Sequence, residues 1–138
     1  MIILRDLTTN ILPNINEHIE LSNIIIFNLN VNFVKDKISF QSTIRPTYNL
    51  VFLNCNLKGV DFSNSKFYDC KFINCDLDNA NFSESSLMGI KYFYSDLSGA
   101  NFKDTTLNNI EFINCHFKNK NIINTDFRQS LLKKEIKI

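Results

Sequence analysis

Four cysteines are the residues of this chain whose type and spacing could support redox or metal chemistry. Cys55, Cys75 and Cys115 are separated by multiples of one common spacing, and Cys70 lies between the first two. Thiolates bind zinc and paired thiols form disulfides, so a metal site and a disulfide between Cys55 and Cys75 both fit the residue types. Serine or alanine fills the equivalent positions elsewhere, which favours small apolar fillers. We therefore expect reduced thiols, no metal and no cofactor.

His116 directly follows Cys115 and gives the second pairing of catalytic residue types. A thiol beside a base is the arrangement of a nucleophilic site. In an extended chain, however, adjacent side chains point to opposite faces, so Cys115 and His116 cannot share a proton or a ligand. The sequence also contains no phosphate-binding loop, no HExxH motif and no nucleophile elbow. We expect no catalytic residue and predict that the protein is not an enzyme.

Acidic residues at regular spacing form the third candidate group. Their side chains either hydrogen-bond the nearby backbone at the corners of the fold, or form a column of negative charge that imitates phosphates. Residues 50–129 contain nine acidic and eight basic residues, whereas a phosphate mimic needs a decidedly negative face. Corner bonding is therefore favoured. The positions retained for an acidic mimic are Asp61, Asp76, Glu84, Asp96 and Asp104.

All these residues are positioned by an uninterrupted repeat of five. Sixteen large apolar residues recur at this spacing, which fits neither the 3.6-residue period of a helix nor the two-residue period of a strand. The chain must therefore turn a corner every five residues and point one large side chain inward on each side. The predicted structural core is Phe52, Leu57, Phe62, Phe67, Phe72, Leu77, Phe82, Leu87, Tyr92, Leu97, Phe102, Leu107, Phe112, Phe117, Ile122 and Phe127.

A second period of twenty residues groups these sides into coils. The run Phe72-Ile73-Asn74-Cys75 recurs two such periods later as Phe112-Ile113-Asn114-Cys115. Twenty residues correspond to four sides, so residues 50–129 predict about four stacked coils of a solenoid.

The order small, polar, large, polar, polar resembles the pentapeptide-repeat family, whose pattern is often written A(D/N)LXX. The runs Ala80-Asn81-Phe82 and Ala100-Asn101-Phe102 match that pattern closely. The resemblance covers residues 50–129 and implies an all-β fold, a right-handed four-sided parallel β-helix. Members with known roles are mostly non-catalytic, and the best understood resemble B-DNA and bind DNA gyrase or topoisomerase IV.

The regions on either side of the repeat do not keep its phase. We predict that residues 1–49 form an N-terminal cap with irregular strands that includes one degraded coil. The alternating polar and apolar residues 27–33 predict one of these strands. Residues 130–138 are predicted to form a C-terminal cap or tail.

One side of the predicted prism carries apolar side chains on its outside. The next side has Lys58, Asp78, Ser98 and Lys118 at the equivalent positions. An apolar surface of several hundred Å² is typical of an interaction site. Either the chain's own termini cover this surface or another chain docks on it. The predicted interface residues are Leu53, Ile73, Phe93, Tyr94 and Ile113.

Composition narrows the functional classes further. Fifteen lysines and arginines face fourteen acidic residues, so no global charge favours nucleic acid or membrane, and neither is expected as a partner. No run of eighteen apolar residues and no signal peptide is present, and with reduced thiols this predicts a cytoplasmic protein.

The leading functional hypothesis is a non-enzymatic interaction protein that binds a protein partner through flat β-helix faces. It would act as a bacterial or phage regulator or inhibitor of a nucleic-acid-handling enzyme. The alternatives are a DNA-mimicking gyrase protection protein and a structural scaffold. We expect a protein partner, with a homodimer as a further alternative.

Overall fold

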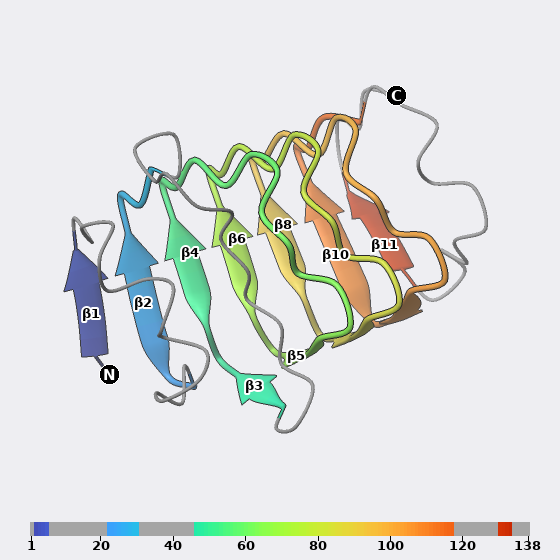
Figure 1. Ribbon diagram of the computed structural model, residues 1–138, viewed down its shortest axis with the longest axis horizontal. Helices are drawn as coiled ribbons and strands as arrows, with labels where there is room; N and C mark the ends of the chain where they lie inside the picture. The colour runs from blue at the N-terminus through green and yellow to red at the C-terminus, as the bar shows by residue number, and fades with distance from the viewer. Residues whose placement is uncertain (1, 6–21, 31–45, 118–129, 134–138) are drawn as a thin grey trace.

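The computed structural model describes residues 2–5, 22–30, 46–117 and 130–133 (Figure 1). Every regular element within these ranges is a β-strand, and all of their pairings are parallel. The chain winds as a β-solenoid of about 3 turns, which confirms the predicted right-handed four-sided parallel β-helix. Residues 118–129, which would complete the predicted fourth coil, lie outside the described ranges.

Two of the four sides are regular sheets. The seven-strand side has the order β1-β2-β4-β6-β8-β10-β11 along the solenoid axis, and the adjacent four-strand side has the order β3-β5-β7-β9 (Figure 1). The strands of the seven-strand side are β1 (Ile2–Arg5), β2 (Ile24–Phe27), β4 (Val51–Leu53), β6 (Lys71–Ile73), β8 (Lys91–Phe93), β10 (Ile110–Ile113) and β11 (Ser130–Lys133). Those of the four-strand side are β3 (Thr47–Tyr48), β5 (Lys66–Tyr68), β7 (Ser86–Met88) and β9 (Thr106–Asn108).

The other two sides are columns of single parallel bridges, named here after one residue of each. The Asp76 side follows the seven-strand side along the chain, and the Asp61 side follows next. The Asp76 side consists of Asn30, Asn56, Asp76, Asp96 and His116. The Asp61 side consists of Asp61, Asn81 and Asn101.

Stacked aromatic rings fill the interior. Phe72 and Tyr92 stack with 5.0 Å between ring centroids, and Phe62 and Phe82 stack at 4.8 Å. The two columns meet edge to face, as at Phe72 and Phe82 with 5.7 Å between centroids. Edge-to-face and offset contacts are the favourable aromatic geometries, so the repeat places each ring against partners in both directions. All predicted core residues from position 52 to position 117 are buried, whereas Ile122 and Phe127 lie outside the described residues.

Where the residue two positions before a centre is cysteine, serine or threonine, its side chain donates a hydrogen bond inside the wall. The Cys75 thiol donates to the carbonyl of Phe52 over 3.4 Å, and the Ser85 hydroxyl donates to the carbonyl of Phe62 over 2.9 Å. Each acceptor belongs to the preceding coil, so these bonds link successive coils. Cysteine and serine therefore fit this position because each is small and carries one hydrogen-bond donor.

Corners depend on a residue that the sequence analysis did not single out. The residue two positions after each centre adopts a left-handed backbone conformation, as at Asn54 with φ 54° and Gly59 with φ 68°. Asparagine, aspartate and glycine tolerate this region best, which explains the abundance of asparagine in the chain. Glu84 and Tyr94 are the exceptions among the described corners.

The N-terminal coil differs from the sequence-based expectation. A single strand over residues 27–33 is wrong where the structure describes it, because β2 ends at Phe27 and Asn28 turns the corner with φ 57°. Ile26 pairs in register with Phe52, and both are buried. The alternation of residues therefore reflects a corner between two sides of a coil. No helix able to span a membrane occurs among the described residues.

Candidate interaction surface

The apolar ladder is a column of outward side chains on the seven-strand side, consisting of Leu53, Ile73, Phe93 and Ile113. Each pairs in register with the next along the column. Because successive strands are about 4.8 Å apart, the four side chains form one continuous apolar row. Each is half-buried by its neighbours. Phe27 of β2 lies in register with Leu53 and extends the same column.

Two different rows flank the ladder. On one flank, Val51, Lys71, Lys91 and Glu111 lie in register, and the Lys91 ammonium lies 3.8 Å from a Glu111 carboxylate oxygen. On the other flank stand the corner residues that follow the ladder in sequence. These corner residues are Asn54, Asn74, Tyr94 and Asn114.

Tyr94 is the unusual member of that corner row. Its side chain is 63 % exposed and its backbone has φ 50°, a conformation that aromatic residues rarely adopt. Asn74 and Asn54 of the same row are linked by a side-chain amide hydrogen bond of 2.9 Å. A tyrosine at this corner therefore interrupts a row of asparagines and places an exposed aromatic side chain at the residue that follows Phe93.

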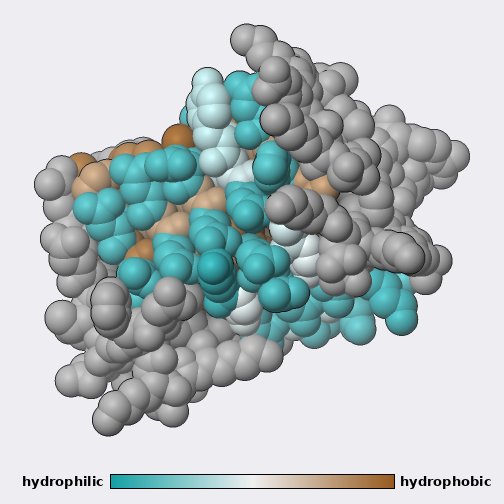
Figure 2. Space-filling model, turned by 90° about the horizontal axis from the view of Figure 1, so that it is seen from above, coloured by the Kyte–Doolittle hydropathy of each residue, from teal (hydrophilic) through white to brown (hydrophobic). Residues whose placement is uncertain are grey.

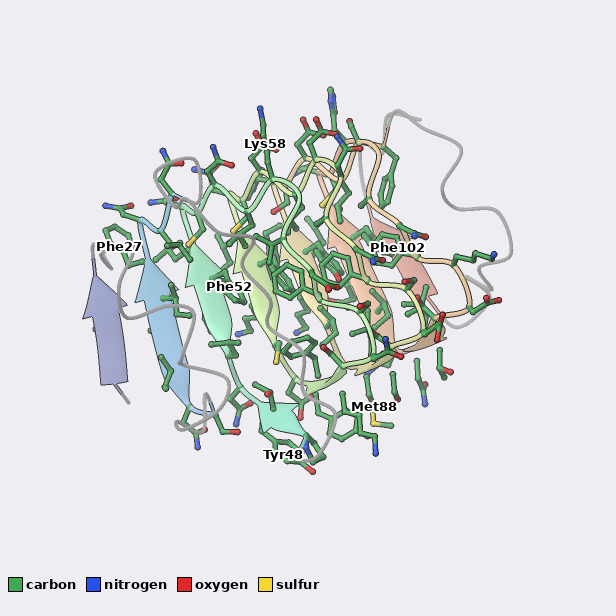
Figure 3. The ribbon with its side chains drawn as sticks, viewed as in Figure 1. Phe27, Tyr48, Phe52, Lys58, Met88 and Phe102 are labelled. Carbon is green, nitrogen blue, oxygen red and sulfur yellow. The ribbon has the colours of Figure 1, made fainter. Side chains whose placement is uncertain are left out.

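The four-strand side carries a second group of exposed apolar residues, which the sequence analysis missed. Tyr48 and Met88 project from the lower edge in Figure 3, with 44 % and 46 % of their surface exposed. The rings of Tyr48 and Tyr68 contact each other with 5.3 Å between centroids. Tyr68 and Met88 follow the repeat centres Phe67 and Leu87 just as the ladder residues follow theirs, so the same test would have identified these two. Tyr48 follows Thr47, which lies before the first centre.

The Asp76 and Asp61 sides show the corner bonding expected from the sequence. The Asp76 carboxylate accepts a hydrogen bond of 3.1 Å from the amide of Asp78, and the Asp96 carboxylate accepts one of 2.9 Å from Ser98. Asp61 accepts from the amide of Ser63 over 2.9 Å. These acidic side chains therefore stabilise turns of the backbone. Glu84 and Asp104 instead occupy left-handed corners and are exposed.

Charge is distributed unevenly among the four sides. In residues 46–117, the Asp76 and Asp61 sides with their corners carry six carboxylates, against Lys58 and Lys103. The other two sides carry three lysines against two carboxylates. Figure 2 shows hydrophilic residues across the face seen from above, the direction in which Lys58 points in Figure 3. A near-neutral sequence therefore folds into a prism with one acidic half.

The cysteines are free and buried. Burial raises the pKa of Cys70 to about 12. A hydrogen bond between the Cys55 and Cys75 thiols lowers the pKa of Cys55, and the same bond together with burial raises the pKa of Cys75. Cys115 is buried while its neighbour His116 lies in the outer Asp76 column. Within the described ranges, no cluster of three or more potential metal ligands is present.

A family model for the pentapeptide repeat region matches residues 65–135, just over half of the chain. The chain belongs to the pentapeptide-repeat family. This confirms the resemblance seen in the sequence, and proteins of this family are generally structural or interaction proteins.

The fold was also compared with solved structures, and the likeness to Rfr23 shows the same fold. Rfr23, a pentapeptide repeat protein from the cyanobacterium Cyanothece, aligns with a TM-score of 0.60 and 16% identity over 85% of this chain and 86% of its own. A trypsin-treated form of QnrB1, a plasmid-mediated fluoroquinolone resistance protein, aligns with a TM-score of 0.36 and 14% identity over 95% of this chain and 77% of its own. No curated protein matches the chain in sequence.

Proposed function

We propose that this pentapeptide-repeat protein is a non-enzymatic binding module that docks a protein partner on its seven-strand side. The observation that carries the proposal is the apolar ladder. Its four side chains point outward in register, whereas the equivalent positions of the Asp76 side hold Lys58, Asp78 and Ser98. A contiguous apolar row beside an ordered sheet is typical of a protein contact surface.

Many of the described polar side chains stabilise the coils themselves, which supports binding as the function. Acidic and amide side chains hydrogen-bond the backbone at the turns, and thiols and hydroxyls link successive coils. We further propose that the protein is a bacterial or phage regulator that docks on a nucleic-acid-handling enzyme and inhibits it.

The proposal is tested with the double variant Ile73→Lys and Phe93→Lys, because a charge inside the ladder prevents apolar docking. The matched control is Ser83→Lys, which adds a lysine where the next coil carries Lys103. Tagged proteins are incubated with host lysate and captured partners are quantified by mass spectrometry. We expect at least one partner to be lost by the double variant and retained by the control.

The thermal midpoint of each variant is measured alongside. If the double variant folds and captures the same partners as the original chain, the ladder is not the docking surface. If its midpoint falls sharply, the substitutions Ile73→Ser and Phe93→Ser repeat the test with smaller perturbation. Light scattering of the original chain then distinguishes a second copy from another protein as the partner.

A second candidate function is the protection of a topoisomerase by imitation of DNA. The observation that favours it is the acidic half of the prism, where six carboxylates face two lysines. A gyrase supercoiling assay with and without a quinolone tests this function, using Glu84→Gln and Asp104→Asn to remove two exposed charges. Activity changes that weaken in this variant support the function, and no effect of the original chain at micromolar concentration contradicts it.

A further inference from the structure

We infer, on the basis of the proposed function, that the ladder binds an amphipathic α-helix of the partner whose flank toward Lys71 and Lys91 is acidic. Three features of the seven-strand side lead to this partner chemistry. They are the spacing of the rungs, the charges of the flanking rows and the aromatic ring at Tyr94.

The rung spacing matches the repeat of a helix face. Neighbouring strands are about 4.8 Å apart, so the four rungs from Leu53 to Ile113 span about 14 Å. Side chains at i, i+4, i+7 and i+11 of an α-helix span about 16 Å along its axis. Alternate residues of an extended strand advance by about 6.7 Å and fall out of step with the rungs. A helix lying along the solenoid axis therefore places one apolar residue near each rung.

The rows that flank the ladder indicate which charges a bound helix should carry. Lys71 is exposed beside the ladder, and Lys91 lies next to it in the same row, where its ammonium also lies 3.8 Å from a Glu111 carboxylate oxygen. Carboxylates on the helix flank above these ammonium groups are attracted, whereas lysines there are repelled. On the opposite flank, Asn54 and Asn74 offer neutral amide groups. The bound helix is therefore acidic on one flank and uncharged polar on the other.

Tyr94 supplies an aromatic anchor at the edge of the same surface. Its exposed side chain directly follows the rung Phe93 in the chain, at a corner whose left-handed backbone suits asparagine better than tyrosine. Exposed tyrosines next to apolar rows are common energetic centres of protein interfaces. A strained aromatic residue at this corner is consistent with a contact to the partner.

The same charges disfavour a second copy of the chain that docks with its strands parallel to those of the first. A two-fold axis along the strands brings ladder against ladder, but an axis at β6 or β8 places Lys71 or Lys91 opposite its own copy. An axis between β8 and β10 pairs Lys91 with the second copy's Glu111, yet only four strands then overlap. That overlap covers about 250 Å² per copy, far below the roughly 800 Å² of a standard interface.

The test uses two designed helical peptides of about 14 residues with the same leucine stripe, one with glutamates and one with lysines on the flank. Binding to the full chain is measured by fluorescence anisotropy. We expect the glutamate peptide to bind at least about tenfold more tightly. The variant Lys71→Glu with Lys91→Glu should reverse that preference, and Lys71→Gln with Lys91→Gln should abolish it.

The matched control is Lys58→Glu with Lys103→Glu, which makes the same charge change on the two acidic sides and should leave the preference unaltered. Equal binding of the two peptides, or a preference that survives reversal of the lysines, overturns the inference. The chain's own termini could also cover the ladder. In that case the folded chain binds neither peptide and the variant Ile73→Ser is less stable than the original chain, and this result also overturns the inference. So does a dimer seen by light scattering at the concentrations used.

Failure of this inference leaves the proposed function separately measurable. If ladder substitutions release a host partner while neither designed peptide binds selectively, the docking surface stands and the acidic-helix chemistry is wrong. If ladder substitutions release nothing, the proposed function itself fails.

Discussion

At the scale of single residues, Tyr92 is the centre residue whose chemistry fits its position least well. Its ring stacks between Phe72 and Phe112 in the interior, with centroid distances of 5.0 and 5.1 Å. The hydroxyl is buried and has no hydrogen-bond partner among the described residues. Burying a hydroxyl without a partner costs about 1–3 kcal/mol, so the ring stabilises the column while its oxygen opposes burial.

We therefore expect Tyr92→Phe to raise the free energy of unfolding by about 1 kcal/mol. Urea denaturation followed by circular dichroism measures the change, and the slope with urea concentration should stay constant. Tyr68→Phe on the outer face is the control and should change little. Destabilisation by Tyr92→Phe would show that the hydroxyl makes a stabilising contact.

Cys70 gives the chain a predicted sensitivity to alkaline pH. Burial raises the pKa of its thiol to about 12, whereas an unfolded cysteine ionises near a pKa of about 8.5. Between these values the unfolded state releases the proton and the folded state keeps it. Stability is therefore complete below about pH 8.5 and falls as the pH rises toward about 12.

The comparison of the original chain with Cys70→Ser isolates this effect, because serine does not titrate in this range. We expect the difference in unfolding free energy between the two proteins to shift by about 2 kcal/mol from pH 7 to pH 10, in favour of the variant. The measurement is urea denaturation under reducing conditions at both pH values. A difference that is independent of pH would mean that the Cys70 thiol ionises normally in the folded state.

At the scale of the structural elements, the corners determine whether each five-residue side can close. Gly99 has φ 69°, and a Cβ atom there would lie 2.6 Å from the Asn79 amide oxygen of the preceding coil. Gly59 has φ 68°, but a Cβ atom would meet no atom within 4 Å. The two glycines therefore separate the cost of a left-handed backbone from the cost of crowding between coils.

We expect Gly59→Ala to destabilise the fold by about 1 kcal/mol, since alanine opposes the left-handed conformation. Gly99→Ala should cost more, because Asn79 must also move away. Thermal and urea unfolding of the two variants provide the measurement. Equal losses would show that the coils accommodate a methyl group at Gly99 without strain.

The five-residue period predicts the interior because every side of the prism repeats the same local pattern. Each centre from Phe52 to Phe117 is buried as that spacing implies. The five-residue period does not predict the coil that contains Ile26. Ile26 pairs with Phe52, and the two residues are separated by more of the sequence than the twenty residues of one regular coil. A period search detects equal spacing only, whereas strand pairing tolerates loops of unequal length.

The candidate surfaces were less accessible to sequence reasoning, for two physical reasons. The net charge of the chain does not show how the charges are arranged, because residues only ten positions apart, such as Asp61 and Lys71, belong to different sides of the prism. The apolar residues Tyr48 and Met88 stand on strands that are two coils apart along the chain, so their proximity emerges only after the coils are stacked. Each residue must therefore be assigned to one side of the prism before a surface can be inferred.

At the scale of the whole molecule, the prism presents different chemistry in different directions. Carboxylates predominate on the Asp76 and Asp61 sides, while the seven-strand side combines the apolar ladder with Lys71 and Lys91. A partner approaching the ladder therefore meets little of the negative charge. Stability comes mainly from the common interior, so the outer sides can differ without altering the fold.

A substitution at Tyr94 tests whether this residue improves partner binding at a cost in folding stability. Asparagine adopts the left-handed conformation more readily than tyrosine and would continue the side-chain row of Asn54 and Asn74. We expect Tyr94→Asn to raise the free energy of unfolding by about 1 kcal/mol, measured by urea denaturation. The same variant should bind the glutamate peptide several-fold more weakly, because it loses the proposed contact between the Tyr94 ring and the peptide.

The control is Tyr68→Asn, which removes an aromatic ring from the four-strand side and should leave peptide binding unchanged. A Tyr94→Asn variant that is more stable and binds equally well would remove Tyr94 from the docking surface. A variant that is less stable would show that the ring contributes to the fold, since the gain from the relaxed backbone would then be outweighed by lost packing. If Tyr94→Asn raises stability and weakens peptide binding, the strained backbone at this corner costs stability and Tyr94 contributes to binding. No other outcome supports that conclusion.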